Sequence, residues 1–154
     1  MLTTDDLMTI DPETVTQDTS LREVVTAMNR ANVRQILVVD GKKLVGIVTD
    51  RDVRLAVNSP LTAEEPLERL ELLNDFSAQD CMTPNPRCVT PETPIHKVAE
   101  LLSMYKFGAL PVVKDDELVG IITVTDLLNQ MALIPEPEKY ISSLRLRILR
   151  THFA

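Results

Sequence analysis

The chain has 154 residues, of which 44% are apolar and 25% are charged, a balance that is ordinary for a soluble globular protein. It contains no run of about 18 apolar residues and no charged-then-apolar leader, so we expect neither a membrane span nor a secretion signal. The formal net charge of −7 argues against broad nucleic-acid binding, which requires a dense basic surface.

The sequence contains the same segment twice. Residues 6–54 align with residues 80–128 at a constant offset of 74 without a gap, and 16 of the 49 paired positions are identical. A repeat of this length predicts two units that cannot cover their apolar faces alone and therefore pack against each other. Such a pseudo-twofold interface creates two equivalent clefts, and these are where we look for function.

Each copy predicts a helix in its first half. Apolar residues recur there at the i, i+3, i+4 and i+7 spacing of a single helical face. They are Leu21, Val24, Val25 and Met28 in the first copy and Ile95, Val98, Ala99 and Leu102 in the second. Thr19 and Thr93 are the expected N-caps, and Pro94 suits the first helical position because its missing N–H has no partner there.

A pair of strands and a second helix follow in each copy. Unbroken runs of valine and isoleucine predict strands that are covered on both faces. We expect strands at 36–39, 44–49, 110–113 and 118–123, with second helices at about 51–57 and 126–133. Each copy, with a β-prone stretch before its first helix, is therefore β-α-β-β-α.

Two segments lie outside the copies. Residues 58–79 interleave leucines with acids and prolines, which predicts a loop with a short helix at 67–73. Residues 134–154 contain two prolines and then an amphipathic stretch, which predicts a C-terminal tail helix. This helix would dock on its own domain or on a sister chain; the alternative is a basic amphipathic helix that seeks a membrane or a partner protein.

Each copy carries a threonine and an aspartate three residues apart where a strand ends and a helix begins: Thr49 with Asp52, and Thr123 with Asp126. At such a junction the helix N-terminus favours an anion, and a carboxylate can accept both vicinal hydroxyls of a ribose. The same residue types are ordinary helix caps. Because duplication copies a cap as readily as a site, the spacing leaves both roles open.

The pattern Asp-x-Met-Thr…Val-Thr…Thr, an apolar strand pair and then Leu-Val-Gly-Ile-x-Thr-x-x-Asp resembles the CBS (cystathionine β-synthase) domain. Two in tandem resemble the CBS pair, or Bateman module, over about residues 6–57 and 80–131. The resemblance implies an α/β (α+β) fold of two β-α-β-β-α repeats packed with pseudo-twofold symmetry. We accordingly expect repeat 1 at 1–57, a linker with a short helix at 58–79, repeat 2 at 80–133 and a tail helix at 134–154.

The resemblance also implies a function. Its clefts would bind an adenosine-bearing regulatory ligand, namely AMP, ADP, ATP or S-adenosylmethionine, with no required cofactor and no catalysis. The chain resembles the stand-alone members of the family, so an unidentified regulated protein would be a partner, and a homodimer is expected. A cytoplasmic location fits the two cysteines, Cys81 and Cys88, which are too far from the histidines in sequence to form a zinc pattern.

Site residues carry over from the resemblance by position. The acid that holds the ribose matches Asp52 and Asp126, and the hydroxyls before it match Thr49, Thr123 and Thr125. Arg51 stands where the second copy has Thr125, and Arg34 matches a basic residue that some members place before the second strand. The opening segment of each repeat would line a cleft, bringing Thr83, Asn85 and Arg87 towards Asp52, and Thr9, Asp11 and Glu13 towards Asp126.

The two clefts are then expected to differ in charge. The first would gather Arg34, Arg51 and Arg87, whereas the second would gather Asp11 and Glu13 with no evident cation. We therefore predict that the Thr49 and Asp52 cleft binds a phosphorylated ligand, and that the other is empty or binds a less negative one. The alternative is that these arginines are ordinary solvated side chains, because an arginine alone does not make a phosphate site.

Three rival functions stay open. In a ligand-independent dimerisation adaptor, Thr49 and Asp52 are merely caps and the arginine-bearing tail is the working surface. A single-stranded nucleic-acid binder conflicts with the net charge of −7 and with an aromatic content of 3% that includes no tryptophan. An enzyme is the remaining class, and the sequence shows no nucleophile with a matching base near His96.

Overall fold

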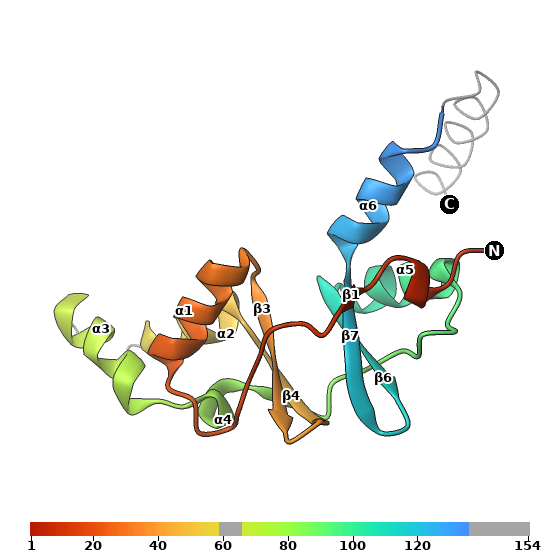
Figure 1. The fold of residues 1–154 in the computed structure, drawn as a ribbon. Coiled ribbons are helices and arrows are strands. Elements are labelled where there is room, and N and C mark those ends of the chain that lie inside the picture. Colours follow the sequence, from red (N-terminus) through yellow and green to blue (C-terminus); the bar gives the residue numbers. More distant parts are fainter. Residues whose placement is uncertain (59–65, 136–154) are drawn as a thin grey trace.

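Two small β-sheets face each other at the centre of the protein, and helices lie on their outer sides (Figure 1). The structure is a computed structural model that describes residues 1–58 and 66–135. The strand orders are β2-β3-β4-β5 and β1-β7-β6. The strands are β1 (Thr9–Ile10), β2 (Thr14–Val15), β3 (Gln35–Asp40), β4 (Lys43–Thr49), β5 (Thr83–Pro84), β6 (Ala109–Lys114) and β7 (Glu117–Thr123). The helices are η1 (Thr4–Asp6), α1 (Leu21–Ala31), α2 (Asp50–Val57), α3 (Pro66–Asp75), α4 (Ala78–Cys81), α5 (Ile95–Tyr105) and α6 (Val124–Ala132).

The predicted mixed fold of two repeats is confirmed. Repeat 1 runs β2-α1-β3-β4-α2, and repeat 2 runs α5-β6-β7-α6 after a single parallel bridge between Val89 and Val112 that stands in place of a first strand. The linker helix is present as α3. Most of the expected tail helix, residues 136–154, lies outside the described residues.

Each repeat has a core of its own between its sheet and its helices. Val24, Ile36 and Val48 are almost fully buried in repeat 1. The residues 74 positions later, Val98, Leu110 and Ile122, are buried in the same way in repeat 2. The duplication therefore preserved the positions at which each repeat buries apolar surface, which is the main stabilising contribution to each half.

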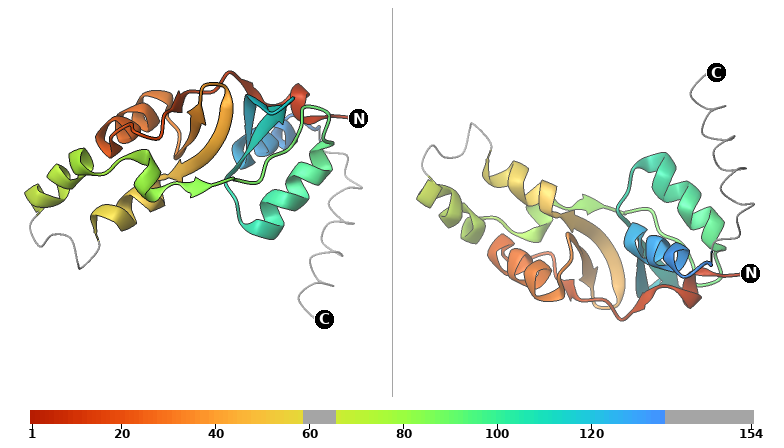
Figure 2. Two further views of the ribbon diagram at one scale, coloured as in Figure 1. Left: turned by 90° about the horizontal axis from the view of Figure 1, so that it is seen from below. Right: turned by 90° about the horizontal axis from the view of Figure 1, so that it is seen from above.

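A third apolar cluster joins the two repeats. Leu37 from β3 is buried against Ala109 and Ile121 of the other sheet. Leu44, Ile47 and Leu118 pack around them. At one end of this interface the Leu118 N–H donates to the Lys42 carbonyl across 2.9 Å. The repeats are thus held face to face through their sheets, as the views in Figure 2 show.

The repeats also exchange their opening segments. β1, from the start of repeat 1, pairs antiparallel with β7 of repeat 2, and β5, from the start of repeat 2, pairs antiparallel with β4 of repeat 1. A glycine permits each approach: a Cβ at Gly120 would lie 2.7 Å from Met8 Sδ and 2.9 Å from the Thr9 carbonyl oxygen, and one at Gly46 would collide with Met82. The exchange brings the start of each repeat to the other repeat, as expected.

Two predicted helix caps are wrong by one residue. Thr19 is not the N-cap of α1, because its hydroxyl accepts the Thr16 N–H at 3.0 Å and closes a turn; Ser20 caps the helix instead. Thr93 accepts the Thr90 N–H in the same way, and Pro94 occupies the cap position rather than the first helical position. The repeated threonine therefore stabilises the turn before each helix.

Candidate functional site

Thr123 and Asp126 hold the junction between β7 and α6. The Asp126 Oδ2 accepts the Thr123 N–H and the Thr123 hydroxyl, both at 2.7 Å. The Thr123 Oγ1 in turn accepts the Asp126 N–H at 3.2 Å. This reciprocal capping box satisfies two orphan N–H groups and fixes both side chains. It engages one carboxylate oxygen; among the described residues none donates to Asp126 Oδ1.

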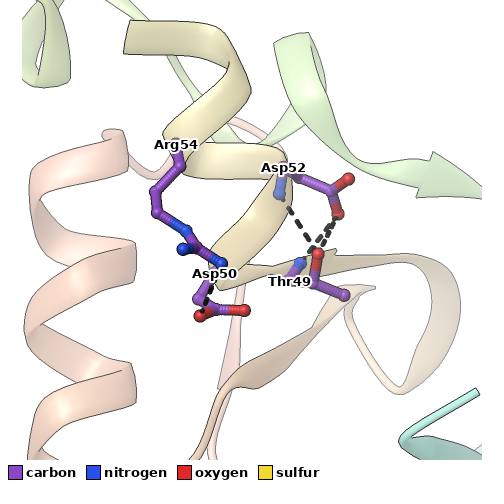
Figure 3. A network of polar contacts seen from close by, with 4 residues as sticks. All are labelled: Thr49, Asp50, Asp52 and Arg54. Carbon is purple, nitrogen blue, oxygen red and sulfur yellow. Dashed lines mark hydrogen bonds and ion pairs between the residues drawn. The ribbon is translucent and has the colours of Figure 1, made fainter. Parts of the chain in front are cut away.

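Thr49 and Asp52 make the same capping box between β4 and α2 (Figure 3), with distances of 2.8, 2.8 and 3.2 Å. In the next turn Arg54 lies 3.4 Å from Asp50, an exposed pair on the same helix. Both copies of the motif are therefore helix caps. The capping role does not exclude a ligand, because each aspartate keeps a second oxygen.

A cavity of about 640 Å³ lies between the repeats beside Asp126. Its volume falls in the range typical of small-molecule sites, about 300–1,000 Å³. The end of α1 and the start of β3 form one wall, the junction of β7 with α6 forms another, and the segment around β1 completes it. Six predicted site residues are among its lining residues: Thr9, Glu13, Arg34, Thr123, Thr125 and Asp126.

The placement of Arg34 corrects the expected charge difference between the clefts. Arg34 lines the cavity of Thr123 and Asp126, so that cavity does have a cation. Glu13 also lines it, as expected, but is paired with Arg30 of α1. Sequence reasoning went wrong here because Arg34 precedes a strand near the pseudo-twofold interface, where its direction decides which cleft it enters. The sequence analysis did not identify Arg30 as the partner of Glu13. Its signal in the sequence is its place in the last turn of α1.

The remaining predicted residues lie away from this cavity. Thr83 pairs with Ile47 on β4, and the Asn85 N–H donates to the Val45 carbonyl at 3.2 Å. The guanidinium carbon of Arg87 lies 4.1 Å from the centre of the Tyr105 ring. Asp11 donates its N–H to Val119 at 3.2 Å and is not among the lining residues, and Arg51 is exposed in the first turn of α2.

The Thr49 side of the interface holds a perturbed thiol. Burial, with smaller contributions from the Asp52 and Asp80 carboxylates, raises the pKa of Cys81 to about 11. Cys81 is therefore a neutral thiol at physiological pH and a poor nucleophile. In the part of the chain that the structure describes, no group of three or more His, Cys, Asp or Glu residues could hold a metal ion.

The cavity combines groups that suit a polar, partly anionic ligand. Asp126 Oδ1 can accept hydroxyl protons, and the Arg34 guanidinium can approach an anion. The Val124 N–H donates to the Gly108 carbonyl at 3.0 Å. The described contacts leave the Thr125 N–H and hydroxyl unpaired at the start of α6. Ile36, Leu37 and Ile121 supply an apolar wall.

Comparison with known proteins agrees with this architecture. The sequence model of the CBS domain matches residues 5–59 and 78–133. A CBS domain-containing protein of Dictyostelium discoideum is 35% identical over 126 residues, which cover 80% of this chain and 87% of that protein. An inosine-5'-monophosphate dehydrogenase of Korarchaeum cryptofilum is 32% identical over 123 residues, but they cover 79% of this chain and 22% of the enzyme.

Solved structures show the same fold. CBSX2 of Arabidopsis thaliana, solved in complex with AMP, superposes with a TM-score of 0.74 at 28% identity and covers 88% of this chain and 100% of its own. The CBS domain pair of protein MJ0100, in complex with 5'-methylthioadenosine and S-adenosyl-L-methionine, gives 0.72 at 25% identity, with coverage of 86% and 97%. The chain belongs to the CBS domain family and carries two of these domains as a pair.

Proposed function

We propose that this protein is a regulatory module that binds an adenosine-containing ligand, such as AMP, ADP, ATP or S-adenosylmethionine, in the cavity beside Thr123 and Asp126. The observation that carries the proposal is the cavity itself, which places a half-engaged carboxylate, a guanidinium and an apolar wall together between the repeats. The adenosine compounds in the two CBS-pair complexes support the ligand class.

Each group has a role in this proposal. Asp126 Oδ1 accepts the ribose hydroxyls while Oδ2 keeps the helix capped. The apolar wall at Ile36 and Ile121 covers the base, and Arg34 with the free Thr125 N–H approaches phosphate or another anion. Thr9 and Glu13 close the cavity from the exchanged segment.

Ligand binding transmits a signal by changing the relative orientation of the two repeats. The cavity has walls from both, so a ligand that contacts both stabilises one relative orientation. It shifts the equilibrium only by its difference in affinity for the two orientations. A regulated protein that contacts both repeats would read this change; no cofactor or catalytic step is required, and we assign the module to the cytoplasm.

A calorimetric titration of the protein with AMP, ATP, S-adenosylmethionine and GMP tests the proposal. The duplication supplies a matched pair of variants, Asp126→Asn and Asp52→Asn, because both weaken an equivalent helix cap. Loss of a charged hydrogen-bond acceptor costs about 1.5–3 kcal/mol, so Asp126→Asn should weaken adenosine-ligand binding by roughly 10- to 150-fold. Asp52→Asn should leave affinity unchanged.

Thermal melts give an independent readout of the same binding. At 100 times its Kd a ligand adds about 2.7 kcal/mol to stability. For a chain of this length that corresponds to roughly 5–11 °C in Tm. Absence of any shift with every adenosine compound would refute ligand sensing and leave the dimerisation adaptor as the better account.

A further inference from the structure

The pseudo-twofold axis relates the cavity beside Asp126 to a second position between the repeats, beside Asp52. Each residue of its wall has a counterpart 74 positions away in the sequence, and Thr49 and Asp52 repeat the capping box of Thr123 and Asp126. If the two clefts were equivalent, the protein would hold two ligands.

The backbone follows the same path at both positions. α1 and α5 each end in a residue with left-handed backbone, Asn32 at φ 53° and Lys106 at φ 59°. The next residue closes each helix with the same hydrogen bond, from Val33 to Met28 at 3.0 Å and from Phe107 to Leu102 at 3.1 Å. Any difference between the clefts at this edge therefore comes from side chains.

Those side chains differ greatly in size. Ala31 and Val33 line the open cavity, and their counterparts are Tyr105 and Phe107. The two rings stack with their centres 5.4 Å apart and their planes 16° from parallel. Small aliphatic walls on one side of the molecule are thus replaced by a stacked aromatic pair on the other.

A charge reversal accompanies the change in size. The counterpart of Glu13 is Arg87, whose guanidinium carbon lies 4.1 Å from the centre of the Tyr105 ring. A guanidinium over an aromatic face is attracted by the ring quadrupole. Arg87 therefore has a partner in Tyr105, although both side chains are exposed.

We propose that each protein chain binds a single ligand, because Arg87, Tyr105 and Phe107 stack at the edge of the cleft beside Thr49 and Asp52, where the open cavity has smaller or acidic side chains; Tyr105 and Phe107 are 38% and 39% exposed. This inference rests on the proposed function of the open cavity. It replaces the expectation that the Thr49 cleft is the phosphate-binding one. It also assigns the Thr49–Asp52 motif to helix capping alone.

A triple variant tests the stack directly. Arg87→Glu, Tyr105→Ala and Phe107→Val together give the cleft beside Asp52 the residues that the open cavity has at these three positions. Calorimetry with the best adenosine ligand should give one site per chain for the unmodified protein and two for the triple variant. The added site should disappear again when Asp52→Asn is combined with the triple variant.

Several results would overturn the inference. Two sites in the unmodified protein, or a loss of one site in its Asp52→Asn variant, would show that the cleft beside Asp52 is open. A folded triple variant with one site would show that the stack is not what closes it. If the triple variant does not fold, the stoichiometry of the unmodified protein and of its Asp52→Asn variant still decides. Failure of the unmodified protein to bind any adenosine compound would instead refute the proposed function.

Discussion

Asp126 shows how one side chain can stabilise a helix and remain available to a ligand. As in Asp52, a single carboxylate oxygen closes the capping box. The sequence predicted both threonine–aspartate pairs and left their role open between cap and ligand. That ambiguity was physical, because the hydrogen-bonding groups that cap a helix N-terminus are those that bind polar ligands.

The Cys81 thiol should resist alkylation until the pH is high. Burial and the Asp52 carboxylate hold its proton, so in a Cys88→Ser background the rate of reaction with iodoacetamide should rise with an inflection near pH 11. Asp52→Asn should lower this inflection because it removes a nearby negative charge, whereas Asp126→Asn, in the other repeat, should not.

The same shift has a consequence for stability. The ordinary pKa of a thiol is 9.0, and burial raises the pKa of Cys81 in the folded protein to about 11. The contribution of Cys81 to the free energy of unfolding is therefore fully present below pH 9 and is lost as the pH rises towards 11. An inflection of the alkylation rate near pH 9 in the folded protein would contradict the burial of this thiol.

At the scale of elements, the hydrophobic pattern predicted much of the fold. Helices α1 and α5 appear where apolar periodicity placed them, and the four long strands appear where unbroken apolar runs did. The expected second helices and linker helix are present as α2, α6 and α3. The helix caps were wrong because a threonine can close the preceding turn as well as cap the helix. The position of Arg34 could not be predicted, because strand patterns fix the face of a residue and not the cleft that a long side chain enters.

Gly120 should be more important for ligand binding than Gly46. In Gly120→Ala the added Cβ would meet Met8 and the Thr9 carbonyl, so β1 must shift away from β7. Overpacking of this kind costs about 1–3 kcal/mol, measurable by urea unfolding. Because β1 carries Thr9 into the cavity wall, affinity for the adenosine ligand should fall as well.

Gly46→Ala provides the control for this prediction. Its Cβ would collide with Met82 beside β5, on the side of the closed cleft. It should lower stability by a comparable amount and leave ligand affinity unchanged. Equal affinity in Gly120→Ala and the unmodified protein would show that the β1 segment does not contribute to the site.

Helix α6 extends away from β7 (Figure 1). Leu128 is 58% exposed and Met131 is 63% exposed on this helix, and Leu55 of α2 is similarly open. Among the described residues no helix has the length and apolar character needed to span a membrane. We propose that these faces meet in a homodimer.

Sedimentation analysis of Leu128→Glu and Met131→Glu tests this dimer. Each variant buries a charge in the proposed interface and should convert the protein to a monomer at micromolar concentration. Ile10→Glu alters another exposed apolar residue, on β1, and should leave the dimer intact. A monomeric unmodified protein would exclude the homodimer and leave the ligand site unaffected.

The interface between the repeats is where the duplicated sequence gives an asymmetric result. The cores repeat position by position, yet one cleft is an open cavity and its counterpart carries Arg87, Tyr105 and Phe107. The asymmetry therefore comes from a few side chains at the edge of the two clefts.

The most direct test of ligand binding between the repeats is a crystal structure of the protein crystallised with AMP or S-adenosylmethionine. We expect difference density for one ligand per chain in the cavity, with its ribose hydroxyls within hydrogen-bond distance of Asp126 Oδ1 and the Arg87–Tyr105 contact retained. Density beside Asp52 with the Asp126 cavity empty, or no ligand between the repeats at saturating concentration, would contradict the account.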